Sequence, residues 1–178
     1  MDNGERCYRR YLDGDESAFD GVLTLYFDNL TFFLNRYVKD LATAEDLAMD
    51  AFLALLIHPT RYHFKTPLKT YLFTIGRNKA LNYLKRRNRF THHELKETDA
   101  ITNDTEQGLL DSEEKRALHT ALAALPLDMR SAVHLVYFED MSYEEAARVM
   151  KKSRKQIDNL LYRAKAILKI KLKEGDKQ

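Results

Sequence analysis

Apolar residues recur at intervals of three and four along most of the chain, which is the period of an amphipathic helix. The first such segment spans about residues 16–39. Its apolar positions are Phe19, Val22, Leu23, Tyr26, Leu30, Phe33, Leu34 and Tyr37. The sequence shows no strand-type alternation, and it holds only 6 glycines and 3 prolines. The pattern therefore predicts an all-α fold.

Two further helices are expected in the first half of the chain. After a short turn, where Thr43 is placed to cap a helix, a second apolar stripe runs to Pro59. Proline ends this helix because it pushes the residue before it out of helical geometry. Residues 60–66 are expected to form a loop, and Pro67 starts a third helix that reaches about Arg87. The apolar positions of the second helix are Leu47, Ala48, Ala51, Phe52, Leu55 and Leu56.

Residues 90–110 differ from the segments on either side. They lack helical periodicity and are rich in Thr, Asp, Asn and Glu, so they are expected to form an acidic flexible linker. The linker divides the chain into two small helical domains, residues 1–89 and residues 111–178. A length of 178 residues is sufficient for two such units.

The second domain contains the most specific local motif. Ser142 and Glu145 have the spacing of a capping box, so a short helix is expected to begin there. After a turn at Lys151 and Lys152, Ser153 is placed to cap a long final helix. Two helices joined by about three residues, the second of them basic, have the form of a DNA-binding helix-turn-helix.

The final helix would place several polar side chains on one side. Asn159 can pair with adenine, Asp158 can accept from cytosine, and Arg163 can meet guanine or phosphate. The candidate contacts to duplex DNA are Arg154, Lys155, Asp158, Asn159, Tyr162 and Arg163. The alternative is an αα-hairpin with a solvated basic face. Ala146 and Ala147 argue against it, because they are small residues at the position where the two helices must cross closely.

The formal net charge of +2 conceals an alternation along the chain. Residues 60–90 contain nine Lys or Arg and no Asp or Glu, and residues 148–173 contain ten Lys or Arg against a single Asp. Residues 94–114 carry eight Asp or Glu against a single Lys, and residues 1–59 are acidic as well. Two separate basic blocks favour two contacts with polyanions over a set of solvated helix faces.

Aromatic residues are interspersed with the cations of the first basic block. Single-stranded nucleic acid is held by such a mixture, because cations bind phosphate and aromatic rings stack on unpaired bases. Aromatic residues at helical spacing are usually buried, so Tyr71 and Tyr83 are assigned to the core or to half-buried positions. Tyr62, His63 and Phe64 in the loop are the candidates for contact with nucleic acid.

Catalysis, cofactors and membrane insertion find little support in the sequence. The six histidines lack metal-ligand spacing, no phosphate-binding glycine loop is present, and Cys7 has no evident base beside it. No apolar run approaches the roughly 18 residues of a membrane span, and the N-terminus does not resemble a signal peptide. A single cysteine favours a reducing compartment. We expect a cytoplasmic protein that is not an enzyme and has no metal, cofactor or small-molecule substrate.

Five segments carry a resemblance to a known family. They are residues 44–52, 68–87, 121–126 with Arg130, 142–147 and 162–165. The first resembles the core-binding helix, the second the promoter-melting helix, and the others the C-terminal helix-turn-helix domain of an extracytoplasmic-function (ECF) sigma factor of bacterial RNA polymerase, in the sigma-70 family. The segments follow the family's order and cover nearly the whole chain. Lys151 departs from the family pattern, since relatives usually have a glycine in this turn.

The resemblance implies a sigma factor that recognises the −10 and −35 promoter elements, melts the DNA and initiates transcription. Its expected partners are core RNA polymerase, promoter DNA (duplex at −35, non-template single strand at −10) and an anti-sigma factor. The implied polymerase contacts are Glu45, Asp46, Asp50 and Phe52. The implied −10 contacts are Tyr62, His63, Phe64, Lys65, Arg77, Asn78, Asn82, Lys85, Arg86 and Arg87. The loop residue that would receive a flipped base stays open. The implied −35 contacts are the six candidate residues of the final helix.

Two other functions stay open from the sequence. A stand-alone helix-turn-helix regulator would use its N-terminal domain to sense a ligand or to dimerise, and it would bind palindromic DNA without polymerase. An adaptor would act through protein contacts alone, so its function would not depend on the cations Arg154 and Lys155.

Overall fold

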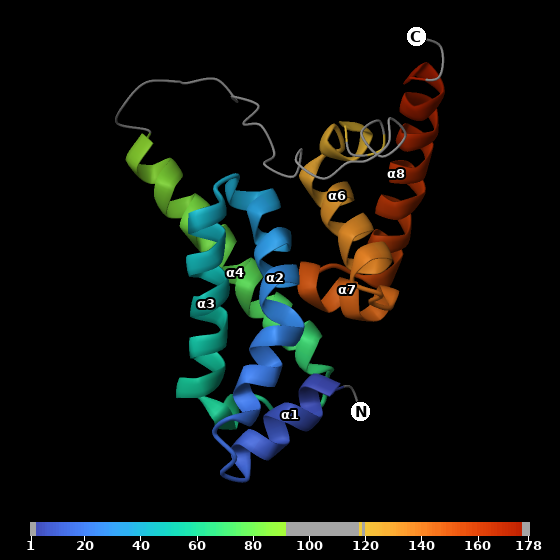
Figure 1. The fold of residues 1–178 in the computed structure, drawn as a ribbon. Coiled ribbons are helices and arrows are strands. Elements are labelled where there is room, and N and C mark those ends of the chain that lie inside the picture. The colour runs from blue at the N-terminus through green and yellow to red at the C-terminus, as the bar shows by residue number, and fades with distance from the viewer. Residues whose placement is uncertain (1–2, 92–117, 119, 176–178) are drawn as a thin grey trace. The chain divides into compact units, whose positions relative to one another are not determined.

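The computed structural model describes residues 3–91, 118 and 120–175, and these residues contain helices and no strand (Figure 1). They fall into two compact units. The helices of the first unit are α1 (Asn3–Leu12), α2 (Ala18–Val38), α3 (Leu41–Ile57) and α4 (Leu68–Thr91), with a 3₁₀ turn at Pro59–Arg61. In the C-terminal half of the chain, α6 (Leu127–Val133) continues into a π-helical segment at His134–Phe138, and α7 (Tyr143–Met150) leads into α8 (Arg154–Gly175). The all-α prediction is confirmed. None of the described helices is both long and apolar enough to cross a membrane.

Helices α2, α3 and α4 surround the core of the first unit. The largest fully buried side chains there are Tyr8, Leu30, Phe33, Leu34, Phe52, Leu55, Leu68, Leu72 and Phe73. The rings of Phe33 and Phe73 lie 5.3 Å apart, between α2 and α4. Gly76 allows these two helices to come close, because a Cβ at this position would lie 2.9 Å from Leu30 Cδ1 and 3.3 Å from Leu34 Cδ1. The predicted apolar stripes are therefore the surfaces on which the helices pack.

The structure corrects two predicted helix ends in this unit. Asp40, not Thr43, caps α3: its backbone is extended (φ −150°, ψ 116°), and its carboxylate accepts a hydrogen bond from the Thr43 N–H at 2.8 Å. Hydrogen bonding by Thr43 lowers the pKa of the Asp40 carboxyl group. Helix α4 continues to Thr91, past the end predicted at Arg87. The rest of the predicted linker, residues 92–110, lies outside the described residues, so the proposed domain boundaries stay predictions.

The second unit has a core of its own. Its buried apolar side chains include Met129, Ala132, Val133, Leu135, Ala146, Ala147, Ile157, Leu161 and Ala164. Ala146 is 0% exposed and Ala147 is 7% exposed, so both small side chains are buried. These small side chains support the helix-turn-helix interpretation over a loosely packed αα-hairpin.

Candidate nucleic-acid interface

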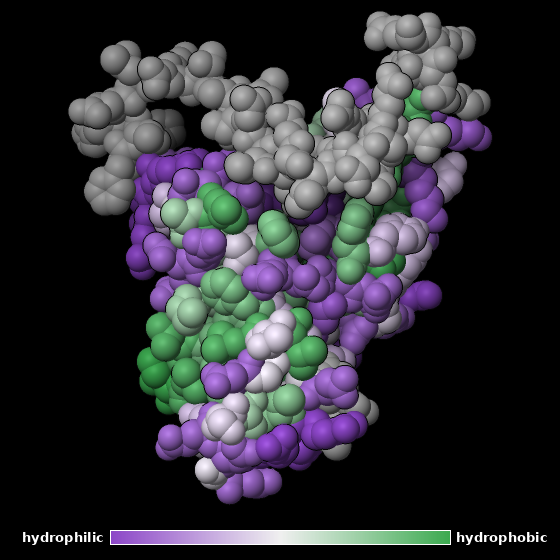
Figure 2. Space-filling view, in the orientation of Figure 1, coloured by the Kyte–Doolittle hydropathy of each residue, from purple (hydrophilic) through white to green (hydrophobic). Residues whose placement is uncertain are grey.

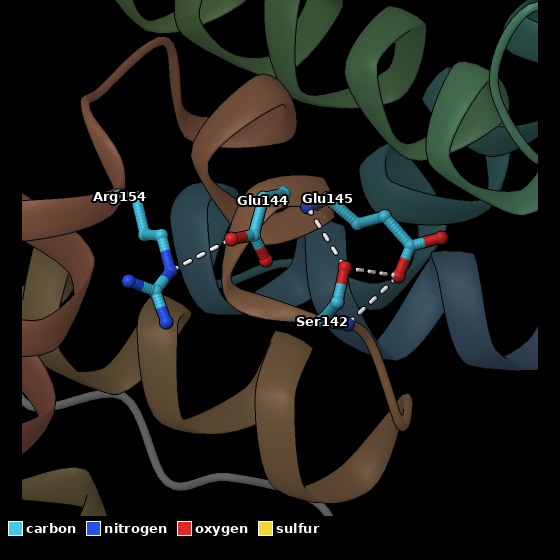
Figure 3. A network of polar contacts seen from close by, with 4 residues as sticks. All are labelled: Ser142, Glu144, Glu145 and Arg154. Atoms are coloured by element: carbon cyan, nitrogen blue, oxygen red, sulfur yellow. Dashed lines mark hydrogen bonds and ion pairs between the residues drawn. The ribbon is translucent and has the colours of Figure 1, made fainter.

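Both helices of the predicted helix-turn-helix begin with a capping box. The Ser142 N–H donates to Glu145 Oε2 at 2.7 Å, and the Glu145 N–H donates to Ser142 Oγ at 3.2 Å (Figure 3). Ser153 and Gln156 exchange the equivalent two bonds, at 2.7 Å and 3.2 Å. These bonds satisfy backbone donors that the first turn of a helix leaves unpaired. They fix the residues at which α7 and α8 begin, so the caps predicted at Ser142 and Ser153 are confirmed.

The turn between α7 and α8 passes through a left-handed backbone conformation at Lys151, whose φ is 53°. The Lys151 N–H donates to the Arg148 carbonyl oxygen at 3.3 Å, and the Lys152 N–H donates to the Ala147 carbonyl oxygen at 3.0 Å. Glycine adopts this conformation readily, whereas a side chain makes it unfavourable. Lys151 therefore keeps the geometry of the turn at a cost in conformational free energy.

Helix α8 has two distinct faces. Ile157, Leu161 and Ala164 are at most 1% exposed and form part of the core. The six residues predicted to contact duplex DNA are all exposed: Arg154, Lys155, Asp158, Asn159, Tyr162 and Arg163. Tyr162 has an exposed fraction of 77%, which is unusual for so large an aromatic side chain. The helix thus presents the whole predicted set on the side that does not pack.

Arg154, the first residue of α8, is tied to α7 by an ion pair. Its Nε lies 2.7 Å from Glu144 Oε1, and its guanidinium carbon lies 5.9 Å from the centre of the Tyr143 ring. In Figure 3 the two terminal nitrogens of Arg154 point away from Glu144. Both partners are exposed, so the pair contributes little to stability but restricts the rotamers of Arg154. The sequence analysis did not anticipate this contact.

Two other cations of the second basic block also have polar partners. Lys152 Nζ lies 3.0 Å from Asp128 Oδ2. A hydrogen bond with the Tyr137 phenol raises the pKa of Lys165, and the ammonium of Lys165 lies 5.4 Å from the centre of the Tyr137 ring. The carboxylate of Asp128 therefore offsets part of the charge of Lys152, whereas Lys165 keeps its full positive charge.

The loop after the 3₁₀ turn holds the predicted single-strand contacts, and the structure corrects one of them. Tyr62 is only 4% exposed. Its hydroxyl lies 2.8 Å from the Thr66 carbonyl oxygen and 3.0 Å from Glu5 Oε1, and its ring lies 5.0 Å from that of Tyr71. A direct contact between Tyr62 and DNA is excluded in this conformation because the neighbouring groups cover the side chain. His63 and Lys65 are exposed, so a role in binding DNA stays a prediction for both.

Phe64 is half-buried and has an unusual backbone conformation. Its φ is 56°, in the left-handed region that bulky residues rarely adopt. The centre of its ring lies 4.6 Å from that of Tyr62, and the guanidinium carbon of Arg9 lies 3.8 Å from it. The ring is therefore held in place by residues of the loop and of α1.

Helix α4 presents some of its predicted contacts and buries one. Arg77 is 8% exposed, and its Nε donates a hydrogen bond to the Tyr37 hydroxyl at 3.1 Å. Its predicted contact with DNA is therefore corrected to a packing role between α4 and α2. Tyr71 and Tyr83 are half-buried, as expected, and so is Asn78. The exposed members of the predicted set on this helix are Asn82, Lys85, Arg86 and Arg87.

The predicted polymerase contacts on α3 also include both exposed and buried residues. Glu45, Asp46 and Asp50 are exposed, but Phe52 is 0% exposed and belongs to the core. A fully buried ring cannot touch a partner, so this expectation is corrected. The carboxylate of Asp50 accepts a hydrogen bond from Lys79 Nζ at 3.1 Å, which links α3 to α4.

Sequence reasoning missed an apolar surface on the same helix. Met49 and Leu53 are each 42% exposed and Ile57 is 68% exposed. Figure 2 shows hydrophobic surface over the C-terminal half of α3. Beside it lies an open groove of about 510 Å³ lined by residues of α3 and α4, among them Leu53, Ile57 and Ile75. The sequence contained a signal for this surface. Met49, Leu53 and Ile57 are apolar, follow one another at intervals of four and lie outside the predicted stripe.

Two segments of the chain match known family descriptions. Residues 23–90 match "Sigma-70 region 2", and residues 115–168 match "Sigma-70, region 4". The RNA polymerase sigma factor CarQ of Myxococcus xanthus is 31% identical over 136 residues, which are 76% of this chain and 78% of that protein. The ECF RNA polymerase sigma factor SigM of Bacillus subtilis is 28% identical over 164 residues, which are 89% of this chain and 97% of that protein.

A solved structure is similar over most of the chain. It is that of the sigma factor RpoE in complex with the anti-sigma factor NepR from Bartonella quintana. Its sequence identity is 28%, its TM-score is 0.69, and the match covers 87% of this chain and 96% of that chain.

The fold and the helix-turn-helix define an all-helical protein of two units that binds DNA. The chain belongs to the sigma-70 family, as an extracytoplasmic-function sigma factor of bacterial RNA polymerase. It acts in the initiation of transcription, and its partners are core RNA polymerase and promoter DNA. The family and the function inferred from the sequence are confirmed, and they replace the regulator and adaptor hypotheses.

Proposed function

We propose that the exposed face of α8 reads the −35 element in the major groove. The observation that carries this proposal is the separation of α8 into a buried face at Ile157, Leu161 and Ala164 and an exposed polar face. Asn159 can pair with adenine, and Asp158 can accept from cytosine while it disfavours nearby phosphates. Arg154, held at Nε by Glu144, has its two terminal nitrogens left to pair with O6 and N7 of a guanine.

The −10 element would be bound by the first unit. The exposed residues His63, Lys65 and Asn82, together with the half-buried Phe64 and Asn78, would contact the non-template strand. The cations Lys85, Arg86 and Arg87 would bind backbone phosphates. Tyr62 and Arg77 would act indirectly in this account, because their buried polar groups hold the loop and α4 in position. Which loop residue would stack on an unpaired base stays open, because the Arg9 guanidinium carbon already lies 3.8 Å from the centre of the Phe64 ring.

Core polymerase would dock on α3. The exposed carboxylates Glu45, Asp46 and Asp50 would supply charge complementarity, and Met49 and Leu53 would supply apolar area between them. A central apolar patch with a charged rim is typical of protein interfaces. This surface takes the place of Phe52, which the sequence analysis assigned to the interface and the structure assigns to the core.

The chain would contribute recognition and positioning, and the chemistry of RNA synthesis would belong to the polymerase. The described residues contain no group of three or more His, Cys, Asp and Glu side chains that could hold a metal ion. The similar sigma factor from Bartonella quintana was solved with an anti-sigma factor. We propose that an anti-sigma factor also binds this chain and that the chain acts in the cytoplasm, where polymerase and promoter DNA meet.

A reconstituted transcription assay tests the proposal. Core polymerase with this chain is expected to give transcripts from a matching promoter, and neither component is expected to do so alone. Arg154→Ala should reduce transcription from a promoter that depends on its −35 element. Lys85→Ala with Arg86→Ala should reduce formation of the open complex instead. Unchanged transcription in both variants would contradict the assignment of the two surfaces.

A further inference from the structure

Helix α1 lies outside the segment that matches Sigma-70 region 2, which begins at residue 23. It nevertheless contacts the loop that contains the candidate −10 residues. Glu5 Oε1 lies 3.0 Å from the Tyr62 hydroxyl. One turn further along α1, the guanidinium carbon of Arg9 lies 3.8 Å from the centre of the Phe64 ring. The loop is therefore held from one side by a helix that the family match does not include.

The Phe64 ring provides a fixed base for this contact. Its position is set by the left-handed backbone (φ 56°) and by packing against two other rings. The centres of the Tyr62 and Tyr8 rings lie 4.6 Å and 6.2 Å from that of Phe64. Tyr8 is fully buried, and its hydroxyl donates to the Leu55 carbonyl oxygen at 3.1 Å. Unfavourable backbone conformations that the surrounding structure maintains are often found at binding sites.

Stacking on Phe64 orients Arg9 without using its hydrogen-bond donors. A guanidinium stacks through its flat face, whereas its five N–H donors lie in its plane and point outward at its edge. Arg9 is an exposed residue. A guanidinium with a supported face and an open edge has the geometry to bind a phosphate group through two N–H donors at once.

The charges around Arg9 suit an anion. The exposed residues His63 and Lys65 belong to the same loop as Phe64. Two carboxylates lie one turn from Arg9 along the chain: that of Glu5 is within hydrogen-bonding distance of the Tyr62 hydroxyl, and that of Asp13 is exposed. A nucleic-acid strand that runs along the loop would therefore meet positive charge from two elements, the loop and α1.

We propose that α1 forms one side of the single-strand site and that Arg9, stacked on Phe64, binds a backbone phosphate of the −10 strand. The inference rests on the proposed binding of the −10 strand by this loop. It adds a contact from a helix outside the matched region, and it assigns Phe64 the role of supporting that contact.

The test is the binding of holoenzyme to single-stranded oligonucleotides over a range of salt concentrations. One oligonucleotide carries the −10 sequence and the other carries the same bases in scrambled order. Arg9→Gln is expected to weaken binding to both by the same factor of several-fold, because a phosphate contact carries no sequence information. It should also reduce the slope of log K against log salt by about 0.7, the value for one phosphate contact on a single strand. Arg9→Lys keeps the charge and should keep most of the slope.

Arg6→Gln is the matched control, because it removes the same charge from an exposed site on the same helix. Phe64→Leu should weaken binding while Arg9 is still present, since the guanidinium loses its support. A slope unchanged by Arg9→Gln, or changed equally by Arg6→Gln, would overturn the inference while the −10 assignment stands. Wild-type holoenzyme that binds neither oligonucleotide would overturn the −10 assignment, and the inference with it. The thermal unfolding midpoint of each variant separates a loss of contact from a loss of folding.

Discussion

Arg154 Nε and Glu144 Oε1 lie 2.7 Å apart, so the first residue of α8 is fixed by a carboxylate of α7. This pair connects the two halves of the helix-turn-helix at the surface that the proposed function places against DNA. A flexible arginine can contact several bases, whereas an arginine held at Nε presents its terminal nitrogens in one direction. The pair would therefore affect the choice of base more than the strength of binding.

Replacing Glu144 is the direct test of this role. Glu144→Ala is expected to reduce discrimination at the base pair read by Arg154 by about tenfold, which lies within the usual 1–3 kcal/mol of a bidentate contact. Glu144→Gln should preserve most of the discrimination, because its amide oxygen still accepts from Nε. Both variants lose one negative charge, so any general gain in DNA affinity should be the same in each. The measurement is competition between −35 duplexes that differ at one base pair, and equal discrimination by the wild type and the Ala variant would contradict the prediction.

Lys151 offers a test of the turn in the helix-turn-helix. Lys151→Gly is expected to stabilise the protein by about 0.5–1 kcal/mol, because glycine adopts the left-handed backbone without a steric penalty. This net value is smaller than the penalty removed, since glycine also raises the conformational entropy of the unfolded chain. Lys155→Gly, inside the first turns of α8, should destabilise it instead. Urea unfolding followed by circular dichroism measures both, and a destabilising Lys151→Gly would show that the Lys151 side chain has a favourable contact.

Phe52 and Leu53 distinguish folding from polymerase binding on α3. Phe52→Ala is expected to cost about 3–5 kcal/mol of folding free energy, because it empties a fully buried site. Leu53→Ser should cost less than about 1 kcal/mol, since the side chain is 42% exposed, but it should weaken the complex with core polymerase about tenfold. The conservative variant Phe52→Leu should fold and bind polymerase normally. Thermal unfolding measures the effect on stability, and fluorescence titration with core enzyme measures the effect on polymerase binding. Normal polymerase binding by Leu53→Ser would show that Leu53 is not part of the interface.

The alternation of charge along the sequence makes a further prediction. Replacing the eight carboxylates of residues 94–114 by the corresponding amides should increase the binding of DNA by the free protein, because these charges lie between the two basic blocks. The increase should be largest at low salt, where electrostatic interactions are least screened. Neutralising the exposed residues Asp13, Asp20 and Asp28 is the control. The measurement is a gel-shift assay without polymerase. If each neutralised carboxylate raised DNA affinity equally in residues 94–114 and in the control set, the acidic segment would have no special role.

The helices and their starting residues could be predicted because they depend on neighbours in the sequence. A capping box needs only residues three apart, and both Ser142 with Glu145 and Ser153 with Gln156 form one. An apolar stripe needs only the helical period, which correctly placed Ile157 and Leu161 in the core. Thr43 was the exception: Asp40, a stronger capping residue three positions earlier, begins that helix.

The three corrected contacts have a common cause. The resemblance assigned Phe52 and Arg77 to interfaces by their positions along the chain. Tyr62 was assigned both by the resemblance and by the mixture of aromatic and basic residues in its loop. Burial depends on what packs against a position, and each of these side chains has partners far away in the sequence: Tyr62 lies beside Glu5, 57 residues earlier, and Arg77 donates to Tyr37, 40 residues earlier. The helical period did place Phe52 in the apolar stripe of α3, but no periodicity within one segment reveals the distant partners of Tyr62 and Arg77.

The sequence by itself determined the all-helical class, the order of the segments, both capping boxes of the helix-turn-helix and the alternation of charge. Each of these follows from residue types and short spacings. Only the tertiary structure decided which side chains remain exposed, that Glu144 holds Arg154, and that Arg9 covers Phe64. The physical reason is that exposure and pairing arise when separate helices and loops pack together, and that packing depends on the shapes of all the surfaces at once.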